Sequence, residues 1–224
     1  MSIKRIMSIF NIFLTLHILG GTLGLLAGTY IAIAKKGDKQ HKLVGKIFAV
    51  SMLGAGFCSF ILATLHRNDF LFVVGIFTIY MVATGWRSLY LKNIPNGQKP
   101  LPIDWIIMGF MAIGALVFAY MSVNLAMEKA PFCLVFAFFA YRSIAFIVTD
   151  FKTYRGKIAT KNYWLTNHLQ RMMGAYIASL TAFVVVNAPE RASIIPWLLP
   201  TAILVPLIVK WTRKYRISLH KTTV

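Results

Sequence analysis

The amino-acid sequence predicts an all-α fold, a polytopic bundle of about seven transmembrane helices in a single domain covering residues 1–224. Of the 224 residues, 58% are hydrophobic and only 13% are charged. That charged share is about half that of an average soluble domain, so the chain could not cover a water-facing surface. The hydrophobic residues fall into seven runs, each long enough for a tilted helix to cross a bilayer. Helices are expected because unpaired backbone polar groups cannot face lipid.

The first run begins after Lys4 and Arg5, as in a signal peptide, but it continues to Ala34 without a small-residue cleavage site. It is therefore predicted to be a retained span. Charged or turn-forming segments separate the later runs, as at residues 35–40, 95–100 and 188–191. The predicted spans cover residues 8–33, 43–65, 70–90, 104–127, 131–148, 164–186 and 195–210.

Lys and Arg are distributed unequally between the two sides of this topology. Seventeen lie on one side and five on the other, which predicts an outside N-terminus and a cytoplasmic C-terminus in the inner membrane. The first group is Lys35, Lys36, Lys39, Lys42, Lys46, Arg87, Lys92, Lys99, Lys152, Arg155, Lys157, Lys161, Lys210, Arg213, Lys214, Arg216 and Lys221. The second group is Lys4, Arg5, Arg67, Lys129 and Arg191.

The net charge of +18 suits anionic lipid headgroups. Nucleic acid is not expected as a partner, because the basic residues lie between hydrophobic runs. Cys58 and Cys133 both fall inside apolar runs and predict neither a disulfide framework nor a zinc site. No hydrolase triad, P-loop or metalloprotease motif appears, so no catalytic residue is predicted.

Three glycines of the first span recur every four residues, at Gly20, Gly24 and Gly28, and so share one helix face. Small residues at this spacing let another helix approach closely. The alternative is that they make room for a flat ligand. Leucine at Gly24 is expected to separate the helices, whereas leucine at Gly97, in a loop, is expected to matter less.

Four histidines lie in or beside the spans, where ionisable residues are costly and are therefore functional candidates. His41 and His168 form an inner, cytoplasmic-side pair, and His17 and His66 form an outer pair. Two stacked histidine pairs are typical of membrane cytochromes that bind haem b, and Arg171 could then meet a propionate. The outer pair differs in depth by roughly two turns. The alternative is that His41 and His66, at span edges, lie among the headgroups.

A polar cluster is expected on the cytoplasmic side, formed by Arg87, Asp104, Arg142 and Asp150 with His168 and Arg171. Arg142 lies about 12 Å into its span, so its guanidinium needs a partner, with Asp104 and Asp150 as the candidates. The cluster is either a structural set of ion pairs or a site for an anion, a lipid headgroup or a proton path.

Three segments carry a resemblance to a known family: His17-Ile18-Leu19-Gly20-Gly21, the stretch from Lys36 to Lys46, and Asn167 to Met172. The most specific is Lys36-Gly37 followed by His41 and Gly45. The chain resembles a bacterial family of predicted multi-pass membrane proteins, domain of unknown function 2306. The resemblance covers most of the chain and implies a topology, with no activity attached.

Two functional hypotheses follow. In the first, the chain is a haem b-binding electron-transfer or redox protein that uses histidines on facing helices. In the second, it is a non-enzymatic membrane protein, either a small transporter or an accessory subunit that binds lipid, a partner complex or further copies of itself.

Overall fold

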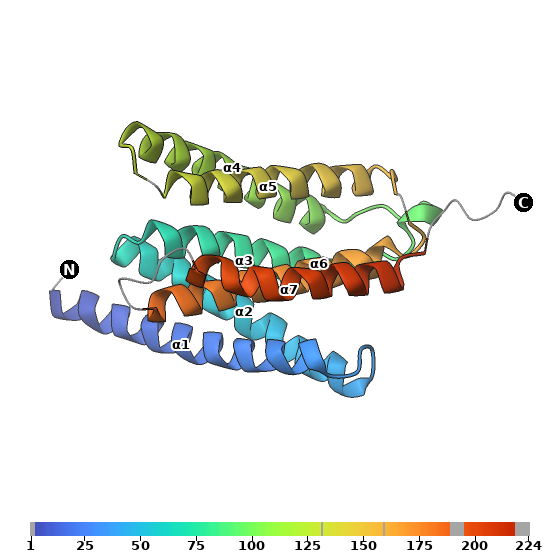
Figure 1. Cartoon of the computed structure of the whole chain (residues 1–224), viewed down its shortest axis with the longest axis horizontal. Coiled ribbons are helices and arrows are strands. Elements are labelled where there is room, and N and C mark those ends of the chain that lie inside the picture. The colour runs from blue at the N-terminus through green and yellow to red at the C-terminus, as the bar shows by residue number, and fades with distance from the viewer. Residues whose placement is uncertain (1–2, 131, 159, 189–194, 218–224) are drawn as a thin grey trace, which may run out of the picture. The chain divides into compact units, whose positions relative to one another are not determined.

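The computed structural model describes residues 3–130, 132–158, 160–188 and 195–217, without the side chains of residues 3–6. Seven α-helices and a short 3-10 helix, η1, follow one another along these residues (Figure 1). Their bounds are α1 Ile3–Ile33, α2 Lys39–Leu65, α3 Asp69–Ser88, η1 Ile94–Asn96, α4 Pro102–Met127, α5 Cys133–Tyr154, α6 Tyr163–Asn187 and α7 Ile195–Tyr215.

All seven α-helices are long and apolar enough to cross a membrane, which confirms the predicted multi-span fold. Several helices extend beyond the apolar runs. α5 continues to Tyr154 instead of ending at residue 148, and α2 begins at Lys39 because the Asp38 carboxylate accepts a hydrogen bond from the His41 backbone N–H at 2.7 Å. An N-cap carboxylate satisfies a backbone N–H of the first turn, so α2 can begin among charged residues.

The chain divides into two compact units, which we describe separately. Unit 1 contains residues 1–83 and 172–207, and unit 2 contains residues 84–171 and 208–224. Helices α3, α6 and α7 therefore contribute residues to both units. A single domain over residues 1–224 stays a prediction.

Unit 1 is built on the close packing of α1 with α2. Small residues also bring α2 near α3: a Cβ placed on Gly56 would lie 3.4 Å from the Gly75 carbonyl oxygen. At the start of α3, the Phe70 ring meets Trp197 of α7 edge to face, with ring centroids 4.8 Å apart. The close approach of α2 and α3 at Gly56 and Gly75 is typical of membrane helices, whose interfaces are rich in small residues.

Unit 2 contains the α4–α5 hairpin, whose helices pack along each other (Figure 1). The Ser122 hydroxyl donates to the Cys133 carbonyl at 2.9 Å and ties the hairpin near its turn. At the opposite end, the segment between α3 and α4 folds onto the start of α6, where Leu91, Ile94 and Tyr163 form a small buried core. The segment between α3 and α4 is therefore packed against α6 at this end of unit 2.

Candidate functional site

A buried ion pair joins α5 to α6 within unit 2. Arg171 Nη2 lies 2.6 Å from Asp150 Oδ1, and the two side chains are only 1% and 3% exposed. The Arg171 guanidinium stacks over the Phe146 ring, 4.1 Å from its centroid, and Arg171 Nε donates to Asn167 Oδ1 at 3.2 Å. A pair that is so thoroughly removed from solvent depends on these extra contacts, because its desolvation is expensive.

A second ion pair joins α3 to α4. The Arg87 guanidinium contacts both carboxylate oxygens of Asp104, at 2.7 and 2.9 Å, and Asp104 is fully buried. Asp104 also accepts the Leu101 backbone N–H at 2.8 Å, so it caps the start of α4. A carboxylate in the first turn of a helix is further stabilised by the helix dipole.

Asn167 connects the Arg171 pair to α3. Its Nδ2 donates to Ser88 Oγ at 2.7 Å, and Ser88 Oγ donates in turn to the Thr84 carbonyl. At the next position of α6, His168 Nδ1 lies 2.8 Å from the Gly85 carbonyl oxygen. Because a carbonyl only accepts, this ring nitrogen carries the hydrogen. The ends of α3, α4, α5 and α6 are thus joined by buried polar contacts.

The surface over this buried network is strongly basic. We call it the basic end of unit 2: the segments 89–101 and 155–162 together with the neighbouring ends of α5 and α7. The C-terminal end of α7 belongs to it because the Lys161 N–H donates to the Ile217 carbonyl at 3.0 Å and Asn162 bonds the Tyr215 carbonyl. Its exposed basic residues are Lys92, Lys99, Lys152, Arg155, Lys157, Lys161, Lys210, Arg213, Lys214 and Arg216.

The carboxylates near the basic end point inward. Asp104 and Asp150 are 0% and 2% exposed and pair with the half-buried Arg87 and the buried Arg171, whereas Glu128 lies at the far end of α4. No acid in the described part of unit 2 is therefore exposed beside the ten cations. The basic end carries a positive charge that its own residues do not neutralise.

Arg142 differs from the expectation for the polar cluster. Asp104 and Asp150, the partners expected for it, pair with Arg87 and Arg171 instead. Arg142 lies half-buried on α5 with its guanidinium over the Phe146 ring, 4.6 Å from the centroid. The expectation failed because the helix face, and not the spacing along α5, decides which guanidinium an acid meets.

The outer histidines occupy different levels of unit 1. His17 Nδ1 lies 2.9 Å from the Ala55 carbonyl oxygen of α2. The exposed His66 ring packs instead near Phe10, with ring centroids 6.2 Å apart. Phe10 precedes His17 by seven residues, about 10 Å along the helix axis. The two rings are not brought together, so they do not fit a single iron between them.

The inner histidines lie in different units, His41 in unit 1 and His168 in unit 2, so their approach stays a prediction. His41 Nδ1 is buried and makes no hydrogen bond with any described residue. Across the described ranges, no group of three or more His, Cys, Asp or Glu could hold a metal ion.

The glycine face of α1 meets its neighbours closely. A Cβ on Gly20 would lie 3.3 Å from the Ser51 carbonyl oxygen, and one on Gly24 would lie 2.5 Å from Met52 Cε. A Cβ on Gly28 would overlap the Tyr176 ring. At these three positions the space that a flat ligand would need is filled by protein.

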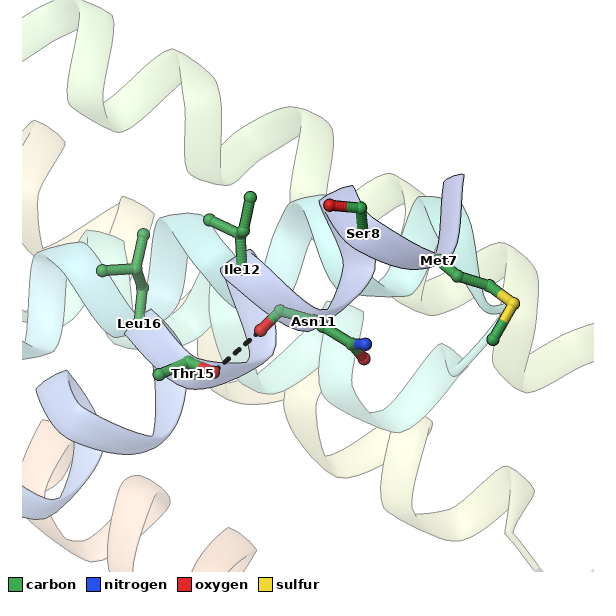
Figure 2. Close-up of a pocket in the computed structure, with 6 residues that line it drawn as sticks. All are labelled: Met7, Ser8, Asn11, Ile12, Thr15 and Leu16. Carbon is green, nitrogen blue, oxygen red and sulfur yellow. Dashed lines mark hydrogen bonds between the residues drawn. The ribbon is translucent and has the colours of Figure 1, made fainter. Parts of the chain in front are cut away.

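A shallow open groove of about 640 Å³ runs along the exposed surface of α1 (Figure 2). All its lining residues belong to that helix: Met7, Ser8, Asn11, Ile12, Thr15 and Leu16. The Thr15 hydroxyl donates to the Asn11 carbonyl at 2.9 Å, as Figure 2 shows. The groove contains no predicted site residue, so we assign it no role.

Comparison of the chain with models of known protein families, with curated proteins and with solved structures gave no match. The resemblance to domain of unknown function 2306 therefore stays a prediction from the three segments quoted above.

Proposed function

We propose that this multi-pass membrane protein is a non-enzymatic accessory protein whose basic end binds anionic phospholipid headgroups. The basic end, with the C-terminus, would then lie on the cytoplasmic side of the inner membrane and the N-terminus outside. One observation supports the proposal most directly. The basic end carries ten exposed cations, while the nearby acids Asp104 and Asp150 are buried in ion pairs. Each cation near an anionic membrane surface contributes about 1 kcal/mol of attraction.

Aromatic residues at the basic end support the same proposal. Lys92 Nζ lies 4.7 Å from the Trp164 ring centroid, and the Arg155 guanidinium lies 5.2 Å from that of Phe151. Trp and basic residues together are typical of the headgroup level of a membrane protein. The buried network beneath them joins the helix ends that carry the cations, so less backbone ordering is needed when a lipid binds.

Lipid titration tests this function. Purified full-length chain in neutral detergent should be stabilised against heat by phosphatidylglycerol and much less by phosphatidylcholine. The double variant Lys157→Gln/Lys161→Gln should bind phosphatidylglycerol roughly tenfold or more weakly, because two exposed cations are lost. The stabilisation should also fall as salt is added.

The matched control is Arg67→Gln/Lys129→Gln, which removes two exposed cations from loops outside the basic end. It should leave the phosphatidylglycerol response unchanged. Equal stabilisation by the two lipids, or an equal loss in both double variants, would refute a lipid site at the basic end.

A haem b-dependent redox function is the second candidate. It is favoured by the buried and unpaired Nδ1 of His41, together with the hydrogen bond that orients His168. A ligating histidine commonly has its second nitrogen fixed by a backbone carbonyl. When bound, haem would supply one-electron chemistry, and His41 and His168, which belong to different units, are the ligands that the sequence predicts for it.

Absorption spectroscopy decides this second candidate. Haem-bound protein should show a Soret band that disappears in His41→Leu and persists in His66→Leu, a control at the other end of α2. Colourless wild-type protein, purified from cells supplied with haem, would eliminate the redox function and leave the lipid-binding proposal intact.

A further inference from the structure

Arg142 lies near the middle of a transmembrane helix. It follows the first residue of α5, Cys133, by nine positions and precedes the last, Tyr154, by twelve. These separations correspond to about 14 and 18 Å of helix. The hydrocarbon core of a bilayer is about 30 Å thick, so the backbone of Arg142 lies close to its midplane.

No described carboxylate neutralises this charge. The guanidinium contacts the Phe146 ring, whereas the ion pairs of unit 2 use Arg87 and Arg171. The five described acids lie elsewhere: Asp38 caps α2, Asp69 meets Arg67, Asp104 meets Arg87, Asp150 meets Arg171, and Glu128 ends α4. A cation at this depth is costly and is normally paired.

The helix surface beside Arg142 is apolar and exposed. Leu134, Phe138 and Tyr141 are 73%, 57% and 67% exposed, and they recur at helical spacing along one face of α5. On the opposite face, Ser143 and Asp150 are buried. Arg142 lies at the boundary between the two faces, where a second helix packed on the apolar face would meet the guanidinium.

We propose that Arg142 pairs with a carboxylate that a transmembrane helix of a different protein carries at mid-depth. Charge complementarity within the membrane selects this partner. A second copy of the chain does not supply the carboxylate, because none of the five described acids is exposed in the middle of a span. A fatty acid fits less well, because its carboxylate belongs at the interface, about 15 Å from the midplane.

A designed helix provides the probe. A synthetic 23-residue Leu/Ala span with lysine flanks carries Glu at its centre, and companion helices carry Leu or Gln there. Energy transfer between a dye on this helix and one on the full-length chain measures association in phosphatidylcholine vesicles. These vesicles lack anionic lipid, so the result is independent of the lipid function proposed for the basic end.

The Glu helix should associate with the wild-type chain about tenfold more tightly than the Leu helix, with the Gln helix between them. Arg142→Gln should abolish this preference. Arg142→Lys should keep much of it, and Lys152→Gln, an exposed cation near the end of the same helix, should keep all of it. If Arg142→Gln does not fold, the wild-type and Arg142→Lys comparisons decide.

Equal association of the Glu and Leu helices with the wild-type chain would overturn the proposal, as would an unchanged Glu preference in folded Arg142→Gln. Arg142-dependent energy transfer between two copies of the chain would assign the site to self-association instead. Arg142-dependent binding of labelled oleate that exceeds the Glu-helix preference would assign it to a lipid acid. Either of these two results would also overturn the proposal.

Discussion

Replacing Arg171 with leucine should destabilise the folded chain by about 3–5 kcal/mol, the cost of leaving one charge of a buried pair alone. The change removes the 2.6 Å contact to Asp150 and the hydrogen bond to Asn167 Oδ1. Asp150 is then left 2% exposed without its guanidinium partner. Unfolding of purified protein by heat or by graded sodium dodecyl sulfate measures the loss.

The double variant Arg171→Met/Asp150→Leu should recover much of that stability, because removing both charges abolishes the desolvation penalty together with the attraction. The control is Arg67→Leu, which breaks the exposed ion pair with Asp69, whose side chains are 89% and 40% exposed. It should cost less than about 1 kcal/mol. If Arg171→Leu costs no more than this control, the buried pair does not stabilise the end of unit 2.

The sequence alone predicts the helices well, because the mean hydropathy of a whole span is a strong signal even where single residues are polar. It places their ends less well, since charged residues end an apolar run but not a helix. α5 continues through Asp150 and Lys152 because Asp150 faces inward, against Arg171. A hydropathy pattern contains no information on that contact.

Arg87, Asp104, Asp150 and Arg171 can be singled out from the sequence, because charges in or beside spans are conspicuous. Their pairing cannot, since it depends on which faces of α5 and α6 meet. Asn167 shows the limit most clearly: it links Arg171 to Ser88, yet asparagine at the start of a span is an ordinary residue. Its link between α3 and Arg171 depends on the three-dimensional positions of the neighbouring helix ends, which the sequence does not contain.

Gly28→Ala should lower stability by about 1–3 kcal/mol, because one added methyl group overpacks a fixed contact. The added Cβ would overlap the Tyr176 ring and lie 3.1 Å from Phe48 Cε2. The Tyr176 ring cannot easily move aside: its hydroxyl hydrogen-bonds Thr29 Oγ1 at 2.7 Å, and it meets Phe48 edge to face. Gly24→Ala should cost less, since Met52 Cε is the end of a flexible side chain, whereas Gly24→Leu should separate the helices.

Gly21 supplies the matched control on the same helix, because a Cβ there meets nothing within 4 Å. Gly21→Ala should be neutral or should raise stability by up to about 1 kcal/mol through helix propensity. Gly97 is unsuitable as a control, because its φ of 88° already disfavours any side chain. Alanine should therefore lower stability at Gly28 and should not lower it at Gly21, measured by unfolding in one detergent. If alanine changes the free energy of unfolding by the same sign and amount at both positions, helix propensity, and not the contact with Tyr176, determines the effect of alanine at Gly28.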